Sequence, residues 1–241
     1  MRTETRHQLK QDRFSQATID VAEKTVHWSA EHQYRLIVGG ALLLLAVGAG
    51  LGGRYYLGER DQSASLALTQ AVRTMNTPVR PANMPPDPEV TTFASNQERA
   101  TAAHKQFQEI INKYPFTKAS DFSHYFMGLN SSELGDNAAA ERELQKVASY
   151  RDADLSSMGK LALASLYRST NRATQAIDLY KQLIAKPSTT VSKVTAQMEL
   201  AETYQTANQP LEAKRTYQEI QRENPSTEIA QMALQKMQDL K

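Results

Sequence analysis

The chain has 241 residues, of which 40% are hydrophobic, and a formal net charge of +2. This length and composition support a packed core of one or two domains. The nearly neutral charge argues against a phosphate-backbone partner, so no nucleic-acid ligand is expected. Cysteine is absent, which excludes disulfides, thiolate metal sites and cysteine nucleophiles.

Residues 1–35 are expected to form a short polar segment in which basic and acidic side chains nearly balance. Phe14, Val21 and Trp28 recur at a seven-residue step. Part of the segment would therefore form a weakly amphipathic helix against a membrane or a partner. A loosely ordered charged tail is the alternative.

An uncharged run follows at residues 36–53, closed by Arg35 and Arg54. As a helix, the run would rise about 27 Å, close to the hydrocarbon thickness of a bilayer. Residues 36–57 are therefore predicted to form a transmembrane helix that contacts lipid. A buried core helix and a cleaved signal peptide are the alternatives for such a run.

Two features of this run bear on assembly and orientation. Gly48 and Gly52 form a small-xxx-small pair that would let two such helices approach closely, which keeps a homodimer open. The basic residues near the run do not decide its orientation. A short N-terminal segment followed by one anchor and a long domain indicates an N-terminus in the cytoplasm.

Residues 58–95 are predicted to be a helix that leaves the membrane, followed by a proline-rich connector. Residues 58–75 lack proline and carry apolar side chains at helical spacing, whereas residues 77–88 contain five prolines that forbid a regular helix. A stiff extended connector and a long loop within the domain are both open. Ser95 and Glu98 form a capping box that marks where helix resumes.

Residues 96–241 are predicted to form a domain of helical repeats. A small residue is followed by a bulky one at +4 and an aliphatic one at +7, four times, at steps of 36 or 37 residues. The four sets are Ala103, Phe107 and Ile110; Ala140, Leu144 and Val147; Ala176, Tyr180 and Leu183; and Ala213, Tyr217 and Ile220.

The same pattern predicts how the helices pair and where they end. Antiparallel helices approach closely where a small side chain lies at the crossing. The proposed crossings pair Gly128 with Ala140, Ala164 with Ala176, and Ala201 with Ala213. A left-handed backbone is expected in the turns at Gly135, Asn171 and Asn208. Prolines that end the second helices are Pro115, Pro187 and Pro225.

Across residues 99–227 this pattern resembles the tetratricopeptide repeat. The resemblance implies an all-α fold, with a single transmembrane helix followed by a tetratricopeptide-repeat α-solenoid. Residues 226–240 are expected to be the C-terminal capping helix that covers the last apolar face, with a partner-binding tail as the alternative.

In such arrays the first helix of each pair lines the concave surface, which gives a candidate peptide groove. Its residues are Phe122, Tyr125, Leu129, Met158, Leu161, Ser165, Arg168, Met198 and Glu202. The groove would be apolar and rich in methionine, and would suit sequence-tolerant contact with peptide or unfolded segments. The alternative is that several of these residues pack against neighbouring repeats. No Lys/Asn clamp for acidic tails recurs at the matching positions.

No chemistry-bearing motif is present in the sequence. The five histidines lack metal-ligand spacing, and no phosphate-cradling glycine motif, nucleophile elbow or HExxH occurs. We therefore expect no catalytic, cofactor or metal site, and no enzymatic activity.

The overall order also resembles a particular bacterial family. A single span, the stretches Gly53-Arg54-Tyr55-Tyr56 and Ser63-Ala64-Ser65-Leu66-Ala67, and the repeats together resemble the YfgM-like inner-membrane proteins. The resemblance implies an inner-membrane protein with its repeats in the periplasm, acting as an adaptor that links the Sec translocon to a periplasmic chaperone or to clients. A structural scaffold of a cell-envelope assembly complex and a cytoplasm-facing regulatory scaffold are the alternatives.

Overall fold

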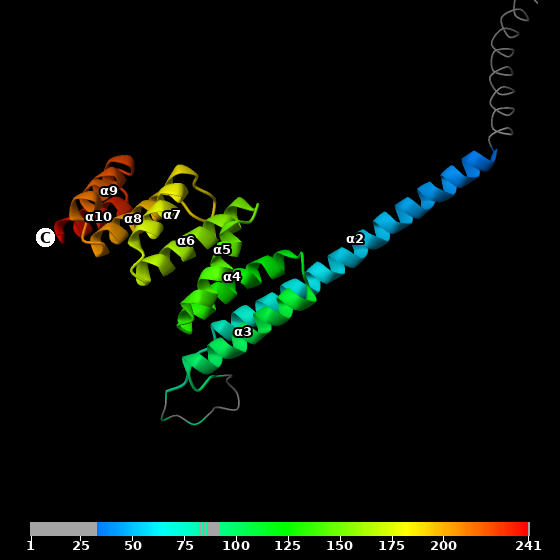
Figure 1. Cartoon of the computed structure of the whole chain (residues 1–241), viewed down its shortest axis with the longest axis horizontal. Helices are drawn as coiled ribbons and strands as arrows, with labels where there is room; N and C mark the ends of the chain where they lie inside the picture. Colours follow the sequence, from blue (N-terminus) through cyan, green and yellow to red (C-terminus); the bar gives the residue numbers. More distant parts are fainter. Residues whose placement is uncertain (1–32, 82, 84, 86–91, 241) are drawn as a thin grey trace, which may run out of the picture. The chain divides into compact units, whose positions relative to one another are not determined.

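The computed structural model of the chain describes residues 33–81, 83, 85 and 92–240, and these are mostly helical (Figure 1). The amphipathic helix expected around Phe14, Val21 and Trp28 lies outside the described residues. The chain divides into two compact units at Glu59 and Arg60.

The first unit is described from Gln33 onward and contains the predicted apolar run. The run lies in α2 (Gln33–Met75). The most apolar 18-residue window of this helix has a mean hydropathy of 2.2, and none of its residues is buried. Leu42 and Leu44, for example, are 62% and 71% exposed. Among the described residues, α2 is the one helix long and apolar enough to cross a membrane.

The second unit begins with the last four turns of α2, which pack against α3 (Asn96–Lys113). Ala64 and Ala71 are buried in one cluster with Ala103 and Phe107 of α3. Small side chains on both helices let the backbones approach closely. The end of α2 therefore supplies the first helix of a pair that α3 completes.

The two ends of the proline-rich segment between α2 and α3 are joined by backbone hydrogen bonds. Val79 pairs with Phe93 in a parallel bridge, where the Arg80 N–H donates to the Phe93 carbonyl at 3.0 Å. The choice between a stiff connector and a loop within the domain stays open. The capping box at its end is confirmed, because the Ser95 hydroxyl accepts from the Glu98 N–H at 3.1 Å.

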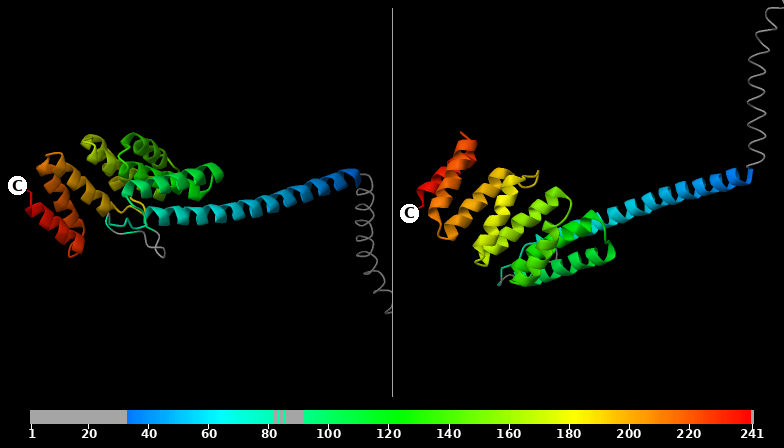
Figure 2. Two further views of the ribbon diagram at one scale, coloured as in Figure 1. Left: turned by 90° about the horizontal axis from the view of Figure 1, so that it is seen from below. Right: turned by 45° about the horizontal axis from the view of Figure 1, so that its top comes forward.

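Seven further helices complete the second unit, each packed against the next in the chain (Figures 1 and 2). They are α4 (Lys118–Glu133), α5 (Asn137–Ala148), α6 (Ala153–Ser169), α7 (Ala173–Ala185), α8 (Lys193–Thr206), α9 (Pro210–Glu223) and α10 (Glu228–Gln238).

The core lies where the repeated pattern predicts it. All twelve residues of the four sets are at most 2% exposed, which confirms the period and the register of the repeats. One proposed crossing is wrong in detail: the atoms nearest to a Cβ built at Gly128 belong to Leu144, not to Ala140.

The expected turn conformations are also confirmed. Gly135, Asn171 and Asn208 have φ of 79°, 60° and 58°, a region that glycine and asparagine enter more readily than other residues. Two residues were not predicted there: Phe116 and Ser226 have φ of 66° and 64°. Each follows one of the helix-ending prolines.

The expected capping helix is α10. Ala230 and Ala233 are buried, and Ile229 and Met237 pack against the core cluster of the preceding repeats. The fold class is thus confirmed: an all-α helical-pair solenoid that ends in a covering helix, preceded by one apolar helix able to cross a membrane.

Candidate peptide-binding pocket

A pocket of about 470 Å³ opens along α4 and α6, with contributions from α5 and α8. We call it the α4–α6 pocket. Five of the nine predicted groove residues line it: Tyr125, Leu129, Leu161, Ser165 and Arg168. They come from the first helices of two successive pairs, as the repeat pattern predicts.

The other four predicted residues do not line this pocket. Phe122 and Met158 are half-buried elsewhere on the same helices, and Met198 packs against the core cluster. Glu202 forms ion pairs just beyond the pocket. The methionine-rich character expected for the groove therefore does not extend to the pocket lining. Leucines give it its apolar surface, with Leu144 and Leu166 joining the two predicted ones.

A network of charges forms the polar end of the pocket. Arg168 Nη1 lies 3.0 Å from Glu199 Oε2 and 3.4 Å from Glu202 Oε2, and Lys236 Nζ lies 3.0 Å from Glu202 Oε1. Two cations thus face two carboxylates. Because the network is neutral, it offers no net charge to steer an acidic or a basic peptide tail.

Neutral donors complete the site. Burial raises the pKa of Tyr125, so its phenol stays protonated at physiological pH. Tyr180, which is fully buried and does not line the pocket, donates to Glu199 at 3.5 Å, and burial raises its pKa as well. Ser165 lies on the lining as an exposed hydroxyl. The pocket therefore presents leucines, hydroxyls and a paired arginine, which suits a mostly apolar segment with a few polar groups.

Sequence reasoning missed six lining residues: Ser132, Leu144, Ala162, Leu166, Ser169 and Glu199. Glu199 lies three residues before Glu202 on α8. Its negative charge, opposite in sign to that of Arg168, could have indicated that it belongs to the same site. Leu144 was assigned to the core, where it is 1% exposed. It belongs to the core and also borders the pocket.

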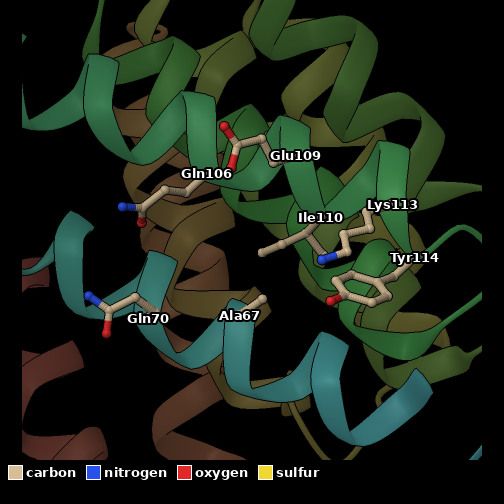
Figure 3. Close-up of a pocket in the computed structure, with 7 residues that line it drawn as sticks. All are labelled: Ala67, Gln70, Gln106, Glu109, Ile110, Lys113 and Tyr114. Atoms are coloured by element: carbon tan, nitrogen blue, oxygen red, sulfur yellow. The ribbon is translucent and has the colours of Figure 1, made fainter. Parts of the chain in front are cut away.

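A second, smaller pocket lies between the paired helices α2 and α3 (Figure 3). Its volume is about 240 Å³. Ala67 and Gln70 of α2 face Gln106 and Ile110 of α3 across it (Figure 3). Its other lining residues are Glu109, Lys113 and Tyr114, the last at the C-cap of α3.

One buried histidine belongs to a structural network on α4 and α5. Lys146 Nζ donates to His124 Nε2 at 2.7 Å, so the other ring nitrogen, Nδ1, carries the proton and donates to Glu143 at 2.6 Å. This hydrogen bond lowers the pKa of Glu143. Among the described residues, no group of three metal-ligating side chains is present.

The two candidate glycines of the apolar run lie on an uncovered helix surface. A Cβ built at Gly48 or Gly52 would meet nothing within 4 Å. A helix contact through this pair stays a prediction.

Comparison with known proteins identifies one of the repeats. A family model described as "Tetratricopeptide repeat" matches residues 195–227, which contain most of α8, all of α9 and the turn that follows. Comparisons with curated proteins and with solved structures found no match. The match covers one repeat, and the stacked helix pairs give the array the fold of a tetratricopeptide-repeat α-solenoid. Repeats of this family typically serve as protein-interaction modules.

Proposed function

We propose that the chain is a membrane-anchored adaptor that holds a segment of a partner protein in the α4–α6 pocket. The observation that carries the proposal is the combination of leucines with a charge-paired Arg168 on successive first helices of the repeats. An apolar side chain of the segment would lie against Leu129 and Leu161. Its backbone would meet Ser165 and Arg168.

The anchor in this proposal is residues 36–57. Their uncovered apolar surface and the absence of charge from 36 to 53 support insertion into a bilayer. A bound segment would then be retained near the membrane. The pair Gly48 and Gly52 would serve as the contact if two copies associate.

We further propose a bacterial inner-membrane location, on the resemblance to YfgM-like proteins. Residues 1–35 would face the cytoplasm, residues 58–95 would lead out of the membrane, and residues 96–241 would carry the repeats in the periplasm. The partner in this arrangement is the Sec translocon, a periplasmic chaperone or an emerging client. A client segment fits the pocket best, because its neutral lining does not select for charge.

Photocrosslinking in living cells tests this proposal. A photoreactive amino acid replaces Ser165, which is exposed within the pocket lining, or Gln182, which is exposed on α7 away from that lining. We expect protein adducts from position 165 and none from position 182. Equal adducts from both positions, or none from position 165, would contradict a role for the pocket.

A pair of arginine variants sharpens this test. Arg168→Ala removes the polar end of the pocket, whereas Arg172→Ala removes an ion pair to Glu141 outside its lining. Adducts at position 165 should fall with the first variant and persist with the second. Many different adducts would indicate a client adaptor. One stoichiometric folded partner would favour the structural scaffold of an envelope complex.

A further inference from the structure

The turn between α3 and α4 presents an aromatic side chain fully to solvent. Phe116 is 100% exposed, the highest exposure among the large apolar side chains of the described residues. Its backbone has a φ of 66°. A bulky residue rarely adopts this left-handed region, so such a residue invites a functional explanation.

The turn itself does not need an aromatic residue, because the chain builds it a second time with serine. After α9, Ser226 has a φ of 64° and also stands between a proline and a capping threonine. Thr117 caps α4 by accepting from the Ser120 N–H at 3.1 Å, and Thr227 caps α10 by accepting from the Ala230 N–H at 3.3 Å. Ser226 thus supports the same turn without an aromatic ring, so the ring of Phe116 contributes little to the turn itself.

Basic and aromatic residues flank Phe116 in the sequence. Lys113 Nζ lies 5.2 Å from the ring centroid of Tyr114, and Lys113 and Lys118 are exposed. Aromatic rings flanked by lysines are typical of segments at the membrane–water interface, where the rings enter the headgroup layer and the ammonium groups face lipid phosphates.

The chain itself keeps this turn close to the end of the apolar run. The Arg60 guanidinium donates to the Pro115 carbonyl oxygen at 3.3 Å, so Arg60 and the turn move together. Arg60 is seven residues beyond Gly53. Seven residues span at most about 25 Å when fully extended, and this limit holds for any arrangement of the two units.

We propose that the α3–α4 turn is a second membrane contact, in which Phe116 enters the interfacial layer of the bilayer and Lys113 and Lys118 face the headgroups. The proposal rests on the proposed function, because it requires that residues 36–57 span the same bilayer. The contact would hold the first helix pair at the membrane surface. The alternative is that Phe116 inserts into an apolar site on a folded partner protein.

Tryptophan fluorescence of the full-length protein in phosphatidylethanolamine–phosphatidylglycerol vesicles tests the contact. The only tryptophan of the chain is removed by Trp28→Phe. A single tryptophan is then introduced by Phe116→Trp or, as the matched control, by Ser226→Trp in the equivalent turn. Emission maximum and quenching by lipids brominated in their acyl chains are measured for each. Phe116→Cys and Ser226→Cys, labelled with an environment-sensitive dye, repeat the comparison without a bulky indole.

We expect blue-shifted emission and strong quenching by brominated lipid at position 116, with neither effect at position 226. Flotation of the vesicles reports the anchor separately. Protein that floats but shows water-like, unquenched emission at position 116 would overturn the membrane contact and leave the anchor intact. A blue shift that needs an added partner protein would overturn it in favour of a protein site. Protein that fails to float would overturn both the anchor and the contact.

Discussion

Gly128 of α4 lies directly against Leu144 of α5. A Cβ built at position 128 would lie 2.6 Å from Leu144 Cγ and 2.7 Å from Cδ2. Because the leucine is 1% exposed, moving it aside would disrupt its packing in the core. We expect Gly128→Ala to lower the free energy of unfolding by about 1–3 kcal/mol through overpacking. Urea unfolding followed by circular dichroism measures the loss.

A double-mutant cycle checks the cause of that loss. Leu144→Ala alone should cost about 2–5 kcal/mol, because it removes a buried side chain. In the Leu144→Ala background, Gly128→Ala should cost much less than in the wild type, because the clashing atoms are gone. Strictly additive losses would show that the Leu144 side chain is not what excludes a Cβ at position 128.

Gly159 of α6 offers a contrasting case. A Cβ built there would lie 2.7 Å from the backbone nitrogen of Ala148 and 2.8 Å from Val147 Cγ1. We expect Gly159→Ala to destabilise the protein as well, by about 1–3 kcal/mol. Val147→Ala should not rescue it, because the backbone of Ala148 cannot be truncated. Full rescue would contradict the close backbone approach of the two helices.

Asn208 tests the left-handed turns. Its φ is 58°, so Asn208→Ala should destabilise the protein by about 1–2 kcal/mol, whereas Asn208→Gly should leave stability nearly unchanged. The two variants serve as each other's control, since both remove the side-chain amide. Equal losses would assign the role of Asn208 to its amide rather than to its backbone conformation.

Glu143 should contribute to the acid sensitivity of the fold. A hydrogen bond from His124 is the main cause that lowers its pKa in the folded state, and burial opposes it. A folded pKa below the unfolded one stabilises the protein at neutral pH, and this stabilisation is lost as the pH falls below about 4.5.

Unfolding by urea from neutral pH down to about pH 3 measures this contribution. Glu143→Gln should destabilise the protein at neutral pH, and the difference from the wild type should shrink in acid. Glu219→Gln, at an exposed glutamate of α9, is the control and should show a small, constant difference. A pH-independent difference for Glu143→Gln would exclude this hydrogen bond as the source.

The repeated pattern made the fold of the second unit predictable from sequence. Each set combines a small residue at the helix crossing with large residues on either side, and both types are fixed by burial, as Ala140 and Tyr180 illustrate at 0% exposure. Asn171 was predictable because few residues enter the left-handed region easily. Burial and a left-handed backbone each restrict which residue types a position accepts, so the residue types indicate these positions.

Other features depended on contacts that no local pattern reports. The pairing of the last turns of α2 with α3 crosses a long proline-rich segment, so the spacing between Ala64 and Ala103 did not reveal it. Met198 belongs to a first helix, as the groove pattern requires, yet it does not line the α4–α6 pocket. Phe116 was overlooked because aromatic residues carry no expectation of a left-handed backbone.

The most direct test of a membrane-anchored adaptor is the topology of the chain, which its lack of cysteine makes simple to measure. Ser15→Cys and, separately, Gln218→Cys at an exposed position of α9 are labelled in intact cells with a membrane-impermeant maleimide, after only the outer membrane is permeabilised. The account predicts labelling at position 218 and protection at position 15 until the inner membrane is opened. Labelling at position 15 alone, or at both positions or neither, would contradict a single span with periplasmic repeats.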